Sequence, residues 1–554
     1  GAGAALAVPW TVGAQAASAA VGGKLAKYRE PLPVPGDGLV VASPAGNANT
    51  YAFTLREIRR QLHPQLPPTP FWAYDDGSGL GGQAGSFGMA VAAHSGTPVR
   101  ASFTNNLPGT YPDWIPVDTR LTAQPDTVVL AMAHLHGGFV AADSDGNPAV
   151  DFDGFGPGET QTVFYTNQLP QMPASLLWFH DHAFGATRLN VFAGLAAAYI
   201  LRDEFDTGTE PNPAGIPGGA YEIPLVIQDR QFNPDGTFLY PTSDIAGVTW
   251  IGEYFGDVML VNGKVWPFVD VEPRLYRLRI LNGCNARIMD LRLGVPLWQI
   301  GAEGGMWDQP VRVKNLVLAP AERADVIADF SHARGQTLVL QNPTPQPPVS
   351  TPAPTLKPVM QFRVGTKVTH QGPTSVPASL PGRAADLPDP KETRYITLNE
   401  VAPETASWNL NLNGLDFEPS ISTPTETPKA GTVEDWVYIN MTGDTHPMHT
   451  HLVTHQVIGR TPFDVAAYQA KFGGDKGVPG GNDPTPYATG PPEPPDPTER
   501  GFKDTTKVNP GYFTTIRAKF DLPTGVTAPQ TYVYHCHIVE HEDNDMMLPF
   551  RVDP

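Results

Sequence analysis

The chain has 554 residues, of which 60 are proline, 55 are glycine and only 2 are cysteine. Its 37 basic and 56 acidic residues give a net charge of −19, which argues against nucleic acid and against a membrane surface as partners, because both are bound through Lys and Arg. Two cysteines exclude a disulfide-stapled scaffold, and the longest apolar stretch, at residues 191–201, is too short to span a membrane.

The chain begins with small and apolar residues, and A-x-A steps close this stretch at residues 1–20. Such a pattern is typical of the apolar core and cleavage site of an export signal. A flexible Ala-rich tail is the alternative. We therefore expect residues 1–24 to be an export-signal remnant or a flexible tail, and the protein to be secreted or held in the cell envelope.

Short apolar runs between many prolines and glycines predict an all-β fold. The clearest helix candidate is 54–62, where Leu55, Ile58 and Leu62 recur at helical spacing. Three segments alternate with period two and end in Asn, at 98–105, 275–282 and 433–440. Their even spacing predicts three related β domains. Linkers rich in turn residues place the domains at 25–205, 206–385 and 386–554.

Histidine is concentrated in pairs that have one residue between them. The four pairs, with two further histidines, are His134 and His136, His180 and His182, His449 and His451 after His446, and His535 and His537 before His541. Residues i and i+2 of a strand point to one face, so each pair presents two imidazoles to the same side. Eight imidazoles exceed the three or four ligands of a zinc site. They indicate a cluster of about three metal ions, for which copper, zinc, iron and nickel are suitable.

The last pair encloses a cysteine. In His535-Cys536-His537, alternation directs the two imidazoles to one side and the thiol to the other. His446 also faces away from the pair that follows it, and it joins Cys536 and His541 in a Cys-His₂ set. Met546 can add a weak axial thioether, although the alternative is a core methionine, since Met547 is adjacent. Trigonal His₂Cys with a long axial Met is the arrangement of blue-copper sites.

These motifs resemble those of the multicopper oxidases, from about residue 28 to residue 554. The resemblance implies three cupredoxin-like Greek-key β-barrel domains, with the middle one as a spacer, four copper ions and O₂ as co-substrate. It assigns His134 and His449 to a type 2 copper and His446, Cys536, His541 and Met546 to a type 1 copper. It assigns the paired type 3 coppers to His136, His180, His182, His451, His535 and His537.

Shorter segments narrow the resemblance to the bacterial spore-coat laccases, the phenoxazinone synthases and the bilirubin oxidases. They are residues 54–74, HLHGG (134–138), DSDG (143–146), GFKDT (501–505) and HEDNDMM (541–547). In that group an acid in DSDG and the Glu after the last His relay protons to oxygen, which makes Asp145 and Glu542 the candidate catalytic residues. A turn role for Asp145 and a solvated charge for Glu542 are the alternatives. A type 1 histidine of the group reaches the surface, so electrons are expected to enter through His446 or His541.

The leading functional hypothesis is a laccase-like oxidase. A monomer would take single electrons from phenols or aminophenols at the type 1 copper and reduce O₂ to water with four electrons. A metallo-oxidase acting on Cu(I) or Mn(II) is the second hypothesis, although the chain, with 11 methionines, lacks the Met-rich segments of cuprous oxidases. A non-catalytic cupredoxin-repeat protein is the third, and it is disfavoured because every copper motif is present.

Two residues outside the motifs also carry expectations. Cys284 has no partner if Cys536 binds a metal, so we expect a buried free thiol. His455 could face the cluster if the strand after His451 continues, but we expect it to be packed and hydrogen-bonded.

Overall fold

The structure, a computed structural model, describes residues 20–554 apart from 40, 46–48, 79–89, 122–126, 244, 246, 345–352, 354, 383–385, 402–408 and 474–480. Most of the predicted export-signal remnant or tail, residues 1–19, lies outside the described residues. The 3₁₀ helix η1 (Gly22–Lys24) precedes Leu25, which is buried in the core.

The first part of the chain forms two four-stranded sheets, with the orders β4-β3-β6-β8 and β5-β10-β9-β7. Their strands are β3 (Thr50–Arg60), β4 (Thr69–Asp75), β5 (Ala90–His94), β6 (Val99–Asn105), β7 (Ala133–His136), β8 (Thr160–Tyr165), β9 (Leu176–Asp181) and β10 (Ala196–Arg202). They are preceded by a two-stranded sheet of β1 (Val34–Pro35) and β2 (Gly38–Leu39). Helix α2 (Thr187–Ala193) joins β9 to β10, and η2 (Ala142–Ser144) follows β7.

The middle part forms a seven-stranded sheet of order β13-β12-β11-β15-β20-β17-β18, a three-stranded sheet β14-β22-β21 and the pair β16-β19. The strands are β11 (Glu222–Arg230), β12 (Val258–Val261), β13 (Lys264–Val265), β14 (Phe268–Val271), β15 (Leu275–Asn282), β16 (Met289–Leu291), β17 (Leu297–Ala302), β18 (Gly305–Val313), β19 (Leu316–Leu318), β20 (Arg323–Asp329), β21 (Thr337–Gln341) and β22 (Pro358–Val364). The 3₁₀ helix η3 (Gly219–Tyr221) leads into β11.

The last part forms a five-stranded sheet β24-β23-β25-β29-β27 and a four-stranded sheet β28-β26-β30-β31. The strands are β23 (Glu392–Val401), β24 (Asn409–Leu412), β25 (Val433–Asn440), β26 (His446–Thr450), β27 (His455–Pro462), β28 (Thr505–Val508), β29 (Tyr512–Lys519), β30 (Gln530–Cys536) and β31 (Met547–Val552). The short helices are α3 (Phe417–Ser420), α4 (Val465–Phe472), α5 (Val539–Glu542), η4 (Thr485–Tyr487) and η5 (Pro497–Glu499).

The prediction of a β protein is confirmed, since strands dominate and the helices are short. We call β3–β10 the first unit, β11–β22 the middle unit and β23–β31 the last unit, because each sheet other than β1-β2 takes its strands from one of these stretches. The proposed domain boundaries 25–205, 206–385 and 386–554 remain predictions.

The three predicted repeat segments are β6, β15 and β25, and they occupy equivalent positions in their sheets. Each pairs in parallel with one strand that precedes it, and antiparallel with one that follows it. The terminal residues Asn105, Asn282 and Asn440 make the same bonds. The side-chain amide donates to two main-chain carbonyls, and its oxygen accepts from the N–H two residues on. The repeat seen in the sequence is therefore a repeated structural corner, by which we mean a strand that ends in an Asn with these three hydrogen bonds.

The predicted helix at 54–62 is wrong. These residues belong mostly to β3, which pairs antiparallel with β4 and in parallel with β6. Tyr51, Phe53 and Leu55 are buried in alternation, which fits a strand, whereas a window that starts at residue 54 misses the first two. Pairing on both sides outweighs the helical spacing of the later apolar residues.

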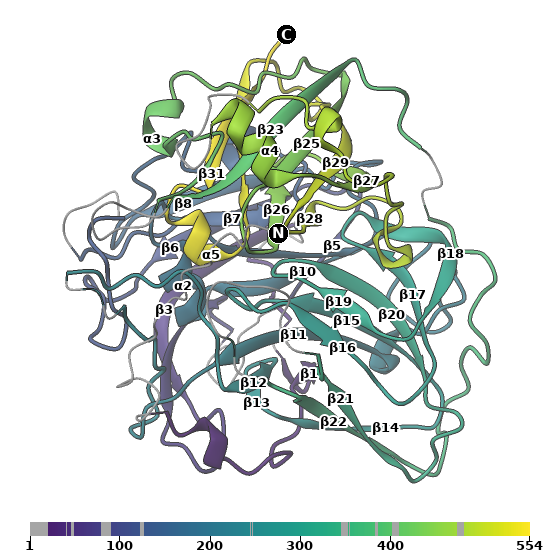
Figure 1. The fold of residues 1–554 in the computed structure, drawn as a ribbon. Coiled ribbons are helices and arrows are strands. Elements are labelled where there is room, and N and C mark those ends of the chain that lie inside the picture. Colours follow the sequence, from purple (N-terminus) through teal and green to yellow (C-terminus); the bar gives the residue numbers. More distant parts are fainter. Residues whose placement is uncertain are drawn as a thin grey trace.

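Figure 1 shows how the units meet. The last unit (green to yellow) lies above the middle unit (teal), and β7 of the first unit lies beside β26 near the centre of the view. Helix α5 of the last unit contacts α2 of the first. One continuous cluster of buried side chains joins strands of these two units, and it includes both β7 and β30.

Candidate metal centres

The predicted metal ligands form two groups of buried side chains. The histidine group contains the eight members of the H-x-H pairs, and the Cys-His group contains Cys536, His446 and His541. Each of these eleven residues is at most 1% exposed. Both groups are therefore shielded from solvent.

Two antiparallel strand pairs carry the histidine group. β7 pairs with β9 so that His134 lies opposite His180, and β26 pairs with β30 so that His449 lies opposite His535. The second histidine of each pair lies two residues on, at or just beyond the strand end, and points to the same face. The strand registers thus bring all four pairs together from two units.

The imidazoles of the two units interleave. His134 stacks on His451 with ring centroids 3.9 Å apart, and His136 stacks on His449 at 3.6 Å. Ring nitrogens lie within 4.8 Å of one another in three sets, which are His134, His136 and His449, then His136, His180 and His537, and finally His182, His451 and His535. The last two sets contain the six residues that the resemblance assigns to the type 3 coppers.

Hydrogen bonds to main-chain carbonyls occupy one nitrogen of several of these rings and leave the other nitrogen available to a metal. The Nδ1–H groups of His134, His180 and His449 donate to the carbonyl oxygens of residues 145, 181 and 504 at 2.6, 2.8 and 2.9 Å. Their Nε2 atoms have no hydrogen-bond partner among the described residues. Burial, followed by the neighbouring imidazoles, lowers the pKa of His134 well below its ordinary value, so the ring is neutral. Buried, unpartnered imidazole nitrogens are costly unless a metal binds them, and this donor set fits copper.

Two carboxylates lie against the histidine group. An Asp145 oxygen lies 2.7 Å from Nδ1 of His451, and burial raises the pKa of this acid to about 8. The oxygens of Glu542 lie 3.2 Å from Nδ1 of His535 and 3.6 Å from Nδ1 of His182. Burial would raise the pKa of Glu542, but these two imidazoles outweigh it and lower the pKa. The solvated-charge alternative for Glu542 is wrong, because this side chain is 1% exposed.

The Cys-His group is a compact triangle. Sγ of Cys536 lies 3.5 Å from Nδ1 of His446 and 3.8 Å from Nδ1 of His541, and the two nitrogens are 3.3 Å apart. The main-chain N–H of Ile538 donates to the same sulfur at 3.4 Å. An N–H directed at sulfur stabilises the thiolate form that a soft metal ion requires.

Met546 and Met547 lie in different apolar clusters. Met546 is fully buried in the same apolar cluster as Cys536, and its carbonyl accepts from the Cys536 N–H at 2.9 Å. Met547 instead packs with Phe417 and Val533 in a separate cluster. The packing therefore favours Met546 as the thioether for this group.

Both His446 and His541 are buried, so the expectation that one of them reaches the surface is wrong. Nε2 of His446 lies 2.7 Å from the Thr442 hydroxyl and 3.5 Å from a Glu400 oxygen. Asp444 and Glu253 lie beside Glu400. Burial, followed by the charges of these two acids, raises the pKa of Glu400 well above its ordinary value.

These three acids escaped the sequence analysis because they are far apart in the chain. Only Asp444, two residues before His446, gave a local signal. Their convergence on one histidine is a property of the fold.

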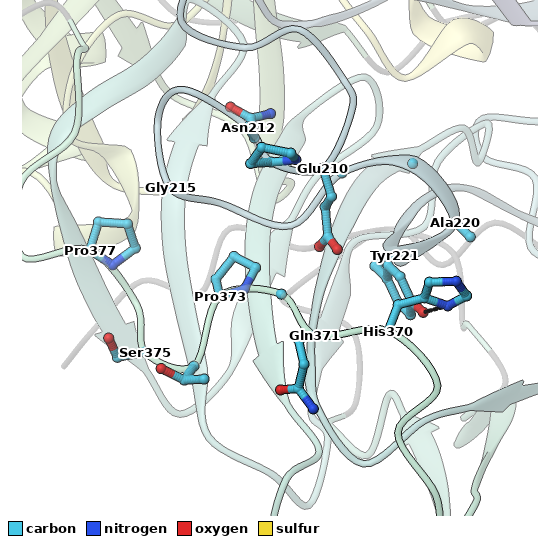
Figure 2. A pocket seen from close by; sticks show the side chains of 15 residues that line it. Glu210, Asn212, Gly215, Ala220, Tyr221, His370, Gln371, Pro373, Ser375 and Pro377 are labelled. Carbon is cyan, nitrogen blue, oxygen red and sulfur yellow. Dashed lines mark hydrogen bonds between the residues drawn. The ribbon is translucent and has the colours of Figure 1, made fainter.

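A cavity of about 780 Å³ lies elsewhere, between segments 210–221 and 370–377 (Figure 2). Several of its polar groups are hydrogen-bonded. Tyr221 contacts His370, and Arg274 beside the cavity donates to Glu210 at 2.6 Å. None of the predicted ligands lines it.

The two remaining expectations agree with the structure. Cys284 is a buried free thiol. His455 is buried in β27, and its Nε2 lies 2.6 Å from the Thr506 hydroxyl, which makes it a packed histidine.

Known proteins resemble the chain over nearly its whole length. The multicopper oxidase family profile matches residues 387–554. A laccase of Bacillus subtilis (strain 168) is 36% identical over 96% of this chain and 99% of its own length. A laccase of Bacillus stratosphericus is 35% identical over 95% and 99%.

The fold is also shared with a solved structure. The McoA multicopper oxidase of Aquifex aeolicus superposes with a TM-score of 0.74 and 26% identity, over 96% of this chain and 100% of the other. The predicted class, an all-β chain of cupredoxin-like domains, is confirmed. Among the described residues, no helix has the length and apolar composition that a membrane crossing needs.

Proposed function

The chain belongs to the multicopper oxidase family, and from this premise we propose that it is a laccase-like oxidase of phenols and aminophenols. Family membership implies copper and O₂, and the proposal adds the reductant and the residue roles. The observation that carries it is the tripeptide His535-Cys536-His537. Its central residue belongs to the Cys-His group, and its outer residues belong to the histidine group.

The buried imidazole and thiol ligands of the two groups suit copper, and we infer four ions. One would be held by Cys536, His446, His541 and Met546, one by His134 and His449, and two by His136, His180, His182, His451, His535 and His537. When bound, the single copper accepts one electron at a time from the reductant, and the three-copper cluster gives four electrons to O₂.

The protein supplies the connection between the two centres. Cys536 is joined through its own peptide bonds to His535 and His537, so a continuous covalent path connects the two centres. The burial of both groups excludes water from the reacting atoms.

Two acids would relay the protons that O₂ reduction consumes. Asp145, whose pKa is raised, would hold a proton on the oxygen 2.7 Å from His451, and Glu542, whose pKa is lowered, would act as a carboxylate that accepts and passes on protons 3.2 Å from His535. Both lie within reach of the histidine group and have no contact with the Cys-His sulfur described above.

The test is O₂ consumption by the purified, copper-loaded protein. The substrates are 2-aminophenols, methoxyphenols, bilirubin, Cu(I) and Mn(II), with the copper-loaded Cys536→Ser variant as the blank. We expect turnover with the phenolic compounds. A clear preference for a metal ion would overturn the phenolic assignment and leave the oxidase assignment intact.

A metallo-oxidase acting on Cu(I) or Mn(II) is the second candidate, and one observation favours it. Glu253, Glu400 and Asp444 form a largely buried acidic cluster, and one of its oxygens lies 3.5 Å from the His446 ring. Carboxylates suit Mn(II), and a cation bound there would lie against a type 1 ligand. The acidic cluster therefore supports the metallo-oxidase hypothesis with an observation that the sequence did not provide.

Three further expectations remain part of the proposal. The protein is exported, acts as a monomer and is divided into domains at 25–205, 206–385 and 386–554. The middle domain holds no copper, which agrees with the lack of an H-x-H pair at residues 206–385.

A further inference from the structure

Asp504 is a buried acid of the GFKDT segment that has no part in the proposed chemistry. It precedes β28 and is 1% exposed. The Nε2–H of His136 donates to its Oδ1 at 3.0 Å. The Nδ1–H of His449 donates to its main-chain carbonyl at 2.9 Å. One residue of the last unit thus holds two imidazoles, and these two rings stack on each other.

These bonds decide which nitrogens face the cluster. A neutral imidazole has one N–H, so donation from Nε2 leaves the lone pair of His136 on Nδ1. That Nδ1 has no hydrogen-bond partner among the described residues, and neither has Nε2 of His449. The Thr505 hydroxyl lies 3.1 Å from the same Nε2, so loss of the Asp504 carboxylate would leave His136 only this neutral acceptor and would fix its ring and tautomer less strongly.

The middle unit fixes this carboxylate. Arg323, at the start of β20, donates to the two oxygens of Asp504 at 2.8 and 2.6 Å. The guanidinium is itself held, because it donates to the carbonyls of Leu176 and Ala321 at 3.0 Å each. A buried ion pair adds little net stability, since desolvation offsets the attraction. Its location beside a ligand residue is therefore better explained by positioning than by stability.

Gly137 supplies a second, independent observation. It follows His136 and has φ +86°, in the left-handed region. A Cβ there would lie 2.7 Å from an Asp504 oxygen and 2.9 Å from an Arg323 nitrogen. The residue that follows the strand carrying His136 therefore leaves room for this ion pair.

We propose that Arg323 and Asp504 are a positioning pair for the histidine group. Arg323 of the middle unit fixes the Asp504 carboxylate, and the carboxylate fixes the ring and the ligating nitrogen of His136. The middle unit is then an active support of the cluster as well as a spacer. The inference rests on the proposed function, because it concerns copper held by the histidine group.

The test compares copper retention in the holoprotein of Asp504→Asn and Arg323→Gln. Glu499→Gln and Arg460→Gln are matched controls, because Arg460 donates to both oxygens of the buried Glu499 at 2.6 and 2.8 Å, away from the histidines. We measure the blue band, the EPR signal of the non-blue copper, and the chelator concentration that removes half of that copper. Loss of a carboxylate that orients a ligand typically weakens metal binding about 10–100-fold.

The positioning role predicts an altered EPR signal and a chelator midpoint about 10–100-fold lower in both test variants, with the blue band unchanged. Test variants that match the controls in both readouts would overturn it. If Arg323→Gln does not fold, the nearly isosteric Asp504→Asn decides alone, with its blue band as the check on folding. Wild-type protein without any non-blue copper signal would instead refute the proposed function, so the two failures are distinguishable.

Discussion

Glu542→Gln is expected to slow the oxidation of the reduced protein by O₂ and to leave its reduction by substrate unchanged. The substitution keeps the shape of a side chain whose oxygens lie 3.2 Å from His535 and 3.6 Å from His182, and removes its charge and its acid–base function. No hydrogen bond joins this carboxylate to the Cys536 sulfur, and its charge affects the pKa of that thiol less than burial and the Ile538 N–H do. The substitution should therefore affect the oxidation of the protein by O₂ and not its reduction by substrate.

The size of the effect follows from the role assigned to the residue. A positioned acid or base contributes about 10²–10⁴-fold to a rate. At about 1.36 kcal/mol per tenfold, this equals about 2.7–5.4 kcal/mol of activation free energy. The hydrogen-bonding shape is retained, so we expect copper content close to that of the wild type.

The assay is a stopped-flow measurement in two steps. The protein is reduced anaerobically by a phenol while the blue band disappears, and it is then mixed with O₂ while the band returns. Glu540→Gln is the matched control, because Glu540 lies on the same helix, is equally buried, and bonds to Tyr240 and Asn285 at 2.9 and 2.8 Å. Unchanged reoxidation in Glu542→Gln, or an equal loss in Glu540→Gln, would refute the proton role.

Three further predictions concern the other features. Cys536→Ser should abolish the blue band and retain the EPR signal of the non-blue copper, and a persisting blue colour would disprove the sulfur assignment. Glu400→Gln should raise KM for Mn(II) about tenfold or more and leave KM for a phenol unchanged if the acidic cluster binds a cation; equal effects on both in steady-state assays would exclude that role. Asn282→Ala leaves two carbonyls and one N–H without their partner, at a cost of about 1–3 kcal/mol each. Urea denaturation should therefore show that the free energy of unfolding falls by at least ~3 kcal/mol. A fall of less than ~1 kcal/mol would contradict the structural role of this corner.

The ligand groups could be predicted because their signal is local. Alternation along a strand sorts His535, Cys536 and His537 onto two faces, and β30 has that alternation. The same holds for the repeat segments, whose period of two and terminal Asn lie within eight residues. A pattern contained in one strand needs no knowledge of the fold.

The rest depends on long-range packing. The spacing of apolar residues at 54–62 predicts a helix, because a short stretch of sequence carries no information on the pairing with β4 and β6. Arg323 and Asp504 are brought together from different units, and so are the acids around His446. The burial of His446 and His541 likewise depends on neighbours that are distant in the sequence.

The repeated corner at Asn105, Asn282 and Asn440 bears on the order of folding and metal loading. The middle copy is complete although its unit contributes none of the twelve predicted copper ligands. A scaffold that forms without metal in one copy does not need metal in the other two, in contrast to small zinc domains that unfold when the ion is removed. The chain is therefore expected to fold first and to take up copper afterwards, into sites whose walls already exist, and copper should be removable and replaceable without denaturation.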